Sequence, residues 1–192
     1  MLALNPPKFL TKQEEDGWKQ AMALARNARG RAEMYYTDYF CRPADKLKRL
    51  QSALKDLEWA ENKFESEITY KCDVASCHMR LGYWWARSEA RDILYNMNSE
   101  PNFEPESPEA VASDAEFKMA EEQLKELLEQ SLSGYGFGEF ELGRAYRLQE
   151  RFDEAIQRLE KAHDIGEEER DISDARITRE IALARARSTT YP

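Results

Sequence analysis

The chain has 192 residues, of which 42% are hydrophobic, and its eight glycines and seven prolines are values of a globular protein rather than a disordered or fibrous one. Its formal net charge is −9, and the excess lies in the second half: residues 1–98 carry 16 basic and 14 acidic side chains, whereas residues 99–192 carry 12 and 23. This acidity argues against nucleic acid as a partner, and the C-terminal half suits a basic peptide or basic protein face.

No stretch of the chain approaches the roughly 18 apolar residues that a membrane span needs, so we expect no membrane partner. The first residues lack the charged region and the apolar core of a signal peptide. Three cysteines, an odd number, suit free thiols in a reducing compartment. We therefore expect a single domain over residues 1–192, located in the cytoplasm.

Helix-favouring residue types and apolar spacings of three and four predict helices along the chain. Thr11 and Glu14 form a capping-box pattern before a first helix, which ends ahead of Pro43. The apolar residues of this helix share one face and are expected to be buried: Trp18, Met22, Ala25, Ala32, Tyr36 and Tyr39.

A second helix is expected to begin at Pro43 and to carry the most regular apolar stripe of the chain. The stripe consists of Leu47, Leu50, Leu54, Leu57, Phe64 and Ile68. It favours a packed hairpin, although a heptad-like spacing also fits a coiled-coil seam. A third helix is predicted to start at Asp73 and a fourth to span 88–97, which completes the N-terminal helices of residues 1–98.

Residues 99–112 are predicted to form an acidic, proline-rich loop. The C-terminal helices of residues 113–192 follow, and the first of them starts at Pro108 or at Ser113. It is expected to bury Phe117, Ala120, Leu124, Leu127 and Leu128. A last helix near 173–188 covers the end of the stack with Ile177, Ile181 and Ala184, and its other face carries Arg176, Arg179, Arg185 and Arg187.

The most specific motif lies at 136–169, where two short helices fold back on each other. Small residues recur where the two backbones must pass closely, and large ones fill the space beside them. The positions in register are Leu142, Gly143, Tyr146, Ala155, Leu159 and Ala162. This run resembles a tetratricopeptide repeat, whose unit of about 34 residues reads W-x2-L-G-x2-Y, then A-x3-F, A and P. Glu139 and Glu167 stand at the Trp and Pro positions.

Leu81, Gly82 and Trp85 echo the L-G-x2-Y run and are interpreted as part of a second, divergent repeat. The resemblance implies an all-α fold, a right-handed α-α superhelix of about seven or eight helices. Related helical repeats with a slightly longer unit share the same run, so the repeat subfamily is left open.

The resemblance also implies a groove, lined by the first helices of the hairpins, that binds a peptide or protein partner. Phe137, Phe140, Arg144 and Arg147 follow one another there at steps of three and four. Two rings beside two guanidinium groups suit a peptide with an apolar anchor and a carboxylate. The Lys and Asn residues with which some members of the family grip a carboxylate are not evident. We therefore expect a non-catalytic adaptor, scaffold or chaperone-like module that needs no cofactor.

Cys72, Cys77 and His78 form the sharpest alternative site. Zinc requires four ligands, and haem attachment would require export, so two thiols and a surface imidazole are the preferred interpretation and no metal is expected. The adjacent Trp84 and Trp85 could form an aromatic ligand wall, but core packing is favoured. The glycines of 134–138 lack the spacing of a phosphate loop and are interpreted as a joint.

Two other functions stay open. One is a structural protein that forms a homodimer through the leucine stripe of 47–68 or through an open end of the stack. The other, less favoured, is a cofactor or metal protein built on Cys72, Cys77 and His78.

Overall fold

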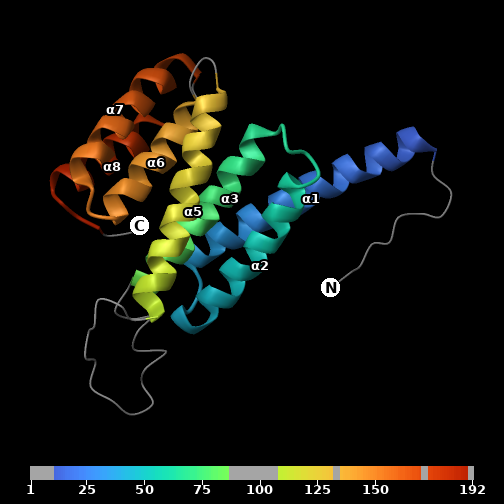
Figure 1. Ribbon diagram of the computed structural model, residues 1–192, viewed down its shortest axis with the longest axis horizontal. Helices are drawn as coiled ribbons and strands as arrows, with labels where there is room; N and C mark the ends of the chain where they lie inside the picture. Colours follow the sequence, from blue (N-terminus) through green and yellow to red (C-terminus); the bar gives the residue numbers. More distant parts are fainter. Residues whose placement is uncertain (1–10, 87–107, 132–134, 170–172, 190–192) are drawn as a thin grey trace, which may run out of the picture.

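The computed structural model describes residues 11–86, 108–131, 135–169 and 173–189. This part of the chain forms seven helices and no strand, and helices that follow one another pack together (Figure 1). The helices are α1 (Lys12–Tyr39), α2 (Pro43–Glu61), α3 (Ile68–Ala86), α5 (Pro108–Gln130), α6 (Gly136–Leu148), α7 (Phe152–Glu169) and α8 (Asp174–Arg185). The predicted all-α class is confirmed. None of the described helices has the length and apolar character that a membrane crossing requires.

Three pairs of helices form hairpins: α1 with α2, α3 with α5, and α6 with α7. In each pair a glycine of the first helix faces a large side chain of the second. A Cβ atom at Gly143 would lie 2.7 Å from Leu159 Cγ. The corresponding contacts are Gly30 with Leu57 at 2.7 Å and Gly82 with Phe117 at 3.0 Å. The helices of each hairpin therefore approach so closely that only glycine fits without a shift.

The second helix of each hairpin repeats one spacing: a small residue, the large residue four positions later, and alanine three positions after that. The three sets are Ala53, Leu57 and Ala60; Ser113, Phe117 and Ala120; and Ala155, Leu159 and Ala162. All of these residues are buried. The pattern predicted for residues 136–169 thus recurs in all three hairpins. Gly82, in the second and divergent copy of the motif, packs against Phe117 of α5 rather than against a residue of the segment directly after α3.

The last helix, α8, packs on α7 and α6. Ile177 and Ala184 are buried and Ile181 is partly buried, as predicted. The predicted outward face of arginines is also confirmed, because Arg176, Arg179, Arg185 and Arg187 are all exposed.

The predicted inward face of α1 was wrong. The helix buries Ala23, Asn27, Gly30, Met34 and Thr37. Of the residues that were expected in the core, Ala25, Ala32, Tyr36 and Tyr39 are exposed, and Trp18 and Met22 are only partly buried. Close packing on α2 requires the small Gly30, and the Asn27 side chain donates a 2.9 Å hydrogen bond to Asp73 of α3. The close fit of Gly30 against α2 and the buried hydrogen bond of Asn27, rather than hydrophobicity, therefore decide which face of α1 packs on the other helices.

The predicted boundary between the second and third helices was also wrong. α2 ends at Glu61, so Phe64 lies in the connecting turn, and Ile68 begins α3. Asp73 is a buried residue within α3 and not its cap. The leucine stripe is used inside the chain, since Leu50 and Leu57 are buried in a cluster with α3 residues.

The predicted loop of 99–112 ends earlier than expected, because α5 already begins at Pro108, one of the two predicted starts. The rest of this loop and the predicted helix 88–97 lie outside the described residues. The burial of Phe117, Ala120, Leu124 and Leu127 on α5 is confirmed, whereas Leu128 is only partly buried.

Candidate functional site

A pocket of about 140 Å³ opens where α1, α3, α6 and α8 face one another. Three of these helices are the first helices of their hairpins, which is the side on which the groove was predicted. We call it the central pocket, lined by Tyr35, Asp38, Tyr39, Arg80, Phe140, Arg144, Arg176, Arg179 and Glu180. Arginine and aromatic side chains predominate there, in contrast to the net charge of −9 of the whole chain.

The four residues predicted to bind a partner do lie together on α6. The Phe137 and Phe140 rings stack with centroids 6.3 Å apart, and the Arg144 guanidinium lies 5.5 Å from the Phe140 ring. Phe140, Arg144 and Arg147 are, however, at most 3% exposed, because α8 packs over them. Phe140 and Arg144 form part of the pocket wall, whereas Phe137 and Arg147 do not line it.

A buried network of charged groups holds α8 against α6. Glu180 of α8 lies 2.8 Å from Arg147 Nε and 3.6 Å from Arg144 Nε. Arg144 also donates to Glu141 at 3.0 Å, and Arg147 donates to the Ser188 carbonyl at 2.6 Å. Each guanidinium thus has a partner within the chain, as buried charges require. A ligand could reach Arg147 only by displacing α8.

A second ion pair joins α3 to α1 at the pocket. Arg80 Nη2 lies 3.1 Å from Asp38 Oδ2, and both side chains are at most 10% exposed. Arg80 Nη1 also donates to the Ser76 carbonyl at 3.0 Å. This arginine therefore contributes little net charge to a ligand and instead fixes α3 relative to α1.

The accessible part of the pocket is its rim, formed by Arg176 and Arg179 of α8 and by Tyr35 and Tyr39 of α1. Among the residues that the structure describes, no carboxylate lies within ion-pairing distance of either arginine. The Arg176 guanidinium lies 5.2 Å from the Phe140 ring, a cation–π distance. Tyr35 and Tyr39 are 44% and 62% exposed. Two arginines and two tyrosines are thus available to a ligand.

Sequence reasoning did not assign these four residues to a site. Arg176 and Arg179 were placed on the solvent-facing side of the last helix, which is correct, but nothing local showed that this side meets α1. Tyr39 was placed in the core. The available signal in the sequence was the spacing of the two arginines, three residues apart on one helix.

The cysteine–histidine cluster does not form a metal site. Cys72 packs in a cluster with α6 and α7 residues, whereas Cys77 packs with α2 residues on another side of α3. The His78 imidazole is buried rather than on the surface, and its Nδ1 lies 2.6 Å from Glu116 Oε2. No group of three or more potential metal ligands occurs in the described part of the chain.

Burial also makes two of the thiols unreactive. It raises the pKa of Cys77 to about 12 and that of Cys72 well above its usual value. Since the thiolate is the reactive form, we expect a thiol reagent at about pH 8 to modify Cys41, which is partly exposed, and to spare Cys72 and Cys77 in the folded protein. Mass spectrometry of the labelled peptides, with urea-unfolded protein as the control, checks this. Rapid labelling of Cys77 in the folded protein would contradict the packing of α3 on α2.

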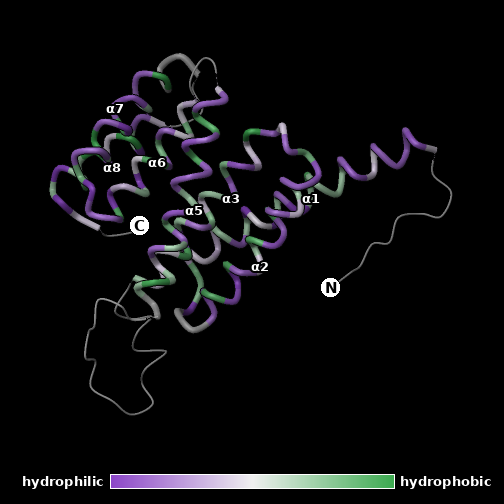
Figure 2. The backbone as a smooth tube through the Cα atoms, viewed as in Figure 1, coloured by the Kyte–Doolittle hydropathy of each residue, from purple (hydrophilic) through white to green (hydrophobic). Residues whose placement is uncertain are grey.

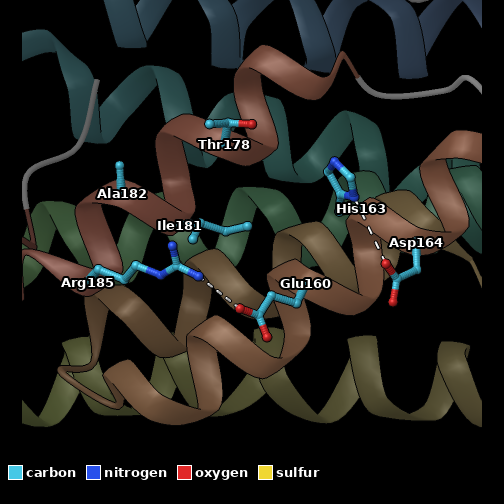
Figure 3. Close-up of a pocket in the computed structure, with 7 residues that line it drawn as sticks. All are labelled: Glu160, His163, Asp164, Thr178, Ile181, Ala182 and Arg185. Carbon is cyan, nitrogen blue, oxygen red and sulfur yellow. Dashed lines mark hydrogen bonds and ion pairs between the residues drawn. The ribbon is translucent and has the colours of Figure 1, made fainter.

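A second, more open pocket of about 380 Å³ lies between α7 and α8. Figure 3 shows Glu160, His163 and Asp164 on α7 facing Thr178, Ile181 and Arg185 on α8. The Arg185–Glu160 ion pair spans it at 3.1 Å, with both side chains more than half exposed. Its charged groups satisfy one another at the surface, so the central pocket is the better candidate site.

The remaining sequence features are structural. The Trp84 and Trp85 rings meet edge to face 4.7 Å apart, and Trp84 belongs to the core. Gly136 and Gly138 lie in the first turn of α6, so residues 136–138 are helical rather than a joint. A Cβ atom at Gly138 would come within 3.2 Å of leucine side chains of α5, which explains the glycine.

A scan against protein-family models finds no match to this chain, and a search of the curated proteins finds no similar one.

Proposed function

We propose that this protein is a non-catalytic, tetratricopeptide-like binding module, an adaptor, scaffold or chaperone-like protein, that holds a segment of a protein partner in the central pocket. The recurrence of one glycine-to-large-residue contact in three hairpins supports the repeat interpretation. The right-handed superhelical path and the cytoplasmic location stay predictions.

The rim of the pocket carries the proposal. Arg176 and Arg179 project from α8 without a carboxylate partner among the described residues, and the exposed rings of Tyr35 and Tyr39 lie on the facing wall. Exposed guanidinium groups bind carboxylates through paired hydrogen bonds, and tyrosine and arginine are enriched among the residues that contribute most to protein interfaces. A volume of about 140 Å³ is smaller than that of a typical small-molecule site, so an extended segment that inserts one side chain fits better than an enclosed metabolite. The partner segment is therefore acidic, with an apolar or aromatic residue beside the acid.

Affinity capture from the native cell, read by quantitative mass spectrometry, tests this function. We expect Arg176→Glu with Arg179→Glu to reduce capture of the main partner by about tenfold or more, because the reversed charges repel an acidic segment. Arg185→Glu is the matched control: it lies on the same helix, but in the pocket between α7 and α8. Equal capture by the wild type and the double variant would remove the central pocket as the binding site. Reversal of Arg144 and Arg147 is unsuitable, because both are buried and their loss would unfold the region.

A further inference from the structure

The exposed face of α1 is apolar along much of the helix. Its members follow one another at steps of three and four: Ala21, Leu24, Ala28, Ala32, Tyr35 and Tyr39. All six are exposed, and Leu24 and Tyr39 are 57% and 62% exposed. This spacing over nearly three heptads is typical of a helix that packs against another helix. We call these residues the α1 outer face.

The helices of the described chain leave this face uncovered. α1 packs on α2 and α3 through its opposite side, and its N-terminal turns project beyond the other helices (Figure 1). The charged residues that border the face have partners within the chain: Arg29 with Asp56, Arg31 with Asp73, and Asp38 with Arg80. The borders therefore present no unpaired charge to an approaching apolar helix, and an exposed apolar face of this length indicates an interaction surface.

We propose that the occupant of the α1 outer face is α1 of a second copy of the chain, running antiparallel, with the two-fold axis at Ala28. Positions equidistant from Ala28 then face each other, and each layer on either side of the axis matches a large side chain to a small one. Tyr35 of one copy, seven residues after Ala28, faces Ala21 of the other, seven residues before it. In the same way Leu24, four residues before Ala28, faces Ala32 of the other copy, four residues after it. At the axis two Ala28 residues meet, so the helices approach closely.

The next layer fits in the same way. Eleven residues from Ala28, Tyr39 meets Gly17, and a Cβ atom added at Gly17 would have no neighbour within 4 Å in its own chain. The ring of one copy therefore has free space on the other. A parallel pair would instead set Tyr35 against Tyr35 and alanine against alanine. Small side chains would then leave gaps in the middle of the interface, and the large rings would clash at its end.

Charge at the two ends of the interface also favours the antiparallel arrangement. The first turns of α1 are mainly hydrophilic (Figure 2) and carry the acidic run Glu14, Glu15 and Asp16. Glu14 lies fourteen residues before Ala28. Fourteen residues after Ala28 a basic stretch begins, which contains Arg42, Lys46 and Lys48. Within the described residues these three cations have no ion-pair partner. The acidic turn of one copy lies beside the basic start of α2 of the other, a pairing that a parallel dimer lacks.

Tyr35 and Tyr39 belong both to this face and to the rim of the central pocket, so a second copy and a partner segment would compete for these two rings. The dimer does not depend on the function proposed for that pocket, and the two proposals are tested at different residues, Ala28 for the dimer and the α8 arginines for the pocket.

Sedimentation analysis of the full chain at increasing concentration tests the dimer. We expect a monomer–dimer equilibrium in the wild type. Ala28→Glu should raise the dimer dissociation constant by about 100-fold or more, since it sets two like charges together at the axis. Ala115→Glu, an exposed alanine of α5, is the matched control and should leave dimerisation unchanged. Circular dichroism should show that both variants keep the wild-type helix content. A wild type that stays monomeric up to about 100 µM, or an unaffected Ala28→Glu dimer, would overturn the proposal.

Cross-linking tests the direction of the helices in a Cys41→Ser background, which removes the one partly exposed thiol. Chains carrying Ala21→Cys, mixed with chains carrying Tyr35→Cys, should form a mixed disulfide dimer under mild oxidation. Ala21→Cys chains alone should not cross-link. Efficient cross-linking of Ala21→Cys with itself would show a parallel pair and would refute the antiparallel interface.

Discussion

Replacing Gly143 with leucine is expected to lower the free energy of unfolding by about 3 kcal/mol, and replacing it with alanine by about 1–2 kcal/mol. A Cβ atom at this position would lie 2.7 Å from Leu159 Cγ and 3.2 Å from the Ala155 carbonyl oxygen. The leucine atom is near the root of its side chain and the oxygen belongs to the backbone of α7, so neither can move aside cheaply. The whole of α7 would have to shift away from α6.

Urea denaturation of the variants measures this loss. Gly17→Ala is the control, because no atom of the same chain lies within 4 Å of a Cβ added there. The proteins are compared at a low concentration at which the chain is monomeric, so that the proposed contact of Gly17 with a second copy does not contribute. Gly17→Ala should be as stable as the wild type or more stable by up to about 1 kcal/mol, since alanine favours the helix over glycine. Opposite signs for the same substitution at Gly143 and Gly17 would separate close packing from helix propensity.

Gly30 extends the test to another hairpin. Its added Cβ would meet Leu57 at 2.7 Å and the Ala53 carbonyl oxygen at 3.1 Å, almost the geometry found at Gly143. Gly30→Ala should therefore destabilise the chain about as much as Gly143→Ala. If both variants unfold like the wild type, the close approach within the hairpins is wrong, and the repeat interpretation is wrong with it.

The α6–α7 hairpin could be predicted from sequence at the level of single residues. The two helices are joined by a short turn after Leu148, so the residues that touch lie close together in the chain. Hydrophobicity does not explain why glycine and alanine occupy the contact points, so these small residues indicate where the two helices pack closely. The α3–α5 hairpin has the same contacts, but 87–107 separates its helices, and no local pattern shows that Gly82 must reach across this segment to Phe117.

The orientation of α1 could not be predicted because both of its faces have helical spacing. The face with more apolar residues looked like the core, yet the buried face contains Asn27, Gly30 and Thr37. Asn27 is acceptable in the interior because Asp73 accepts its hydrogen bond, and Asp73 lies on another helix. Burial of a polar residue depends on a partner that is distant in sequence, and a single helix gives no information about it.

The same limit applies to the candidate site. Arg144 and Arg147 were expected at the surface because charged residues usually are. They are buried because Glu180, more than 30 residues later in the chain, lies between them on α8. The arginines that a ligand can reach belong to α8 itself. Which arginines are buried and which are exposed thus depended on where the last helix packs.

Replacing Glu180 with alanine is expected to lower the free energy of unfolding by about 3–5 kcal/mol, the usual cost of removing one partner of a buried ion pair. Arg147 is fully buried and Arg144 is 3% exposed, so neither guanidinium can turn to water once the carboxylate is lost. Glu141 would still pair with Arg144, whereas Arg147 would lose its ion pair with Glu180 and would keep its hydrogen bond to the Ser188 carbonyl. The loss of stability is therefore expected to come mainly from Arg147.

Two further variants separate charge from packing. Glu180→Gln keeps the size of the side chain and an acceptor oxygen, so it should cost less than Glu180→Ala. Glu160→Ala removes the partner of Arg185 from an exposed pair between α7 and α8, and should cost at most about 1 kcal/mol. Urea denaturation of the three variants gives the order directly. A loss at Glu180→Ala no larger than that at Glu160→Ala would mean that water reaches Arg147, and that α8 does not seal the predicted groove. In that case Arg144 and Arg147 would be available to a partner after all.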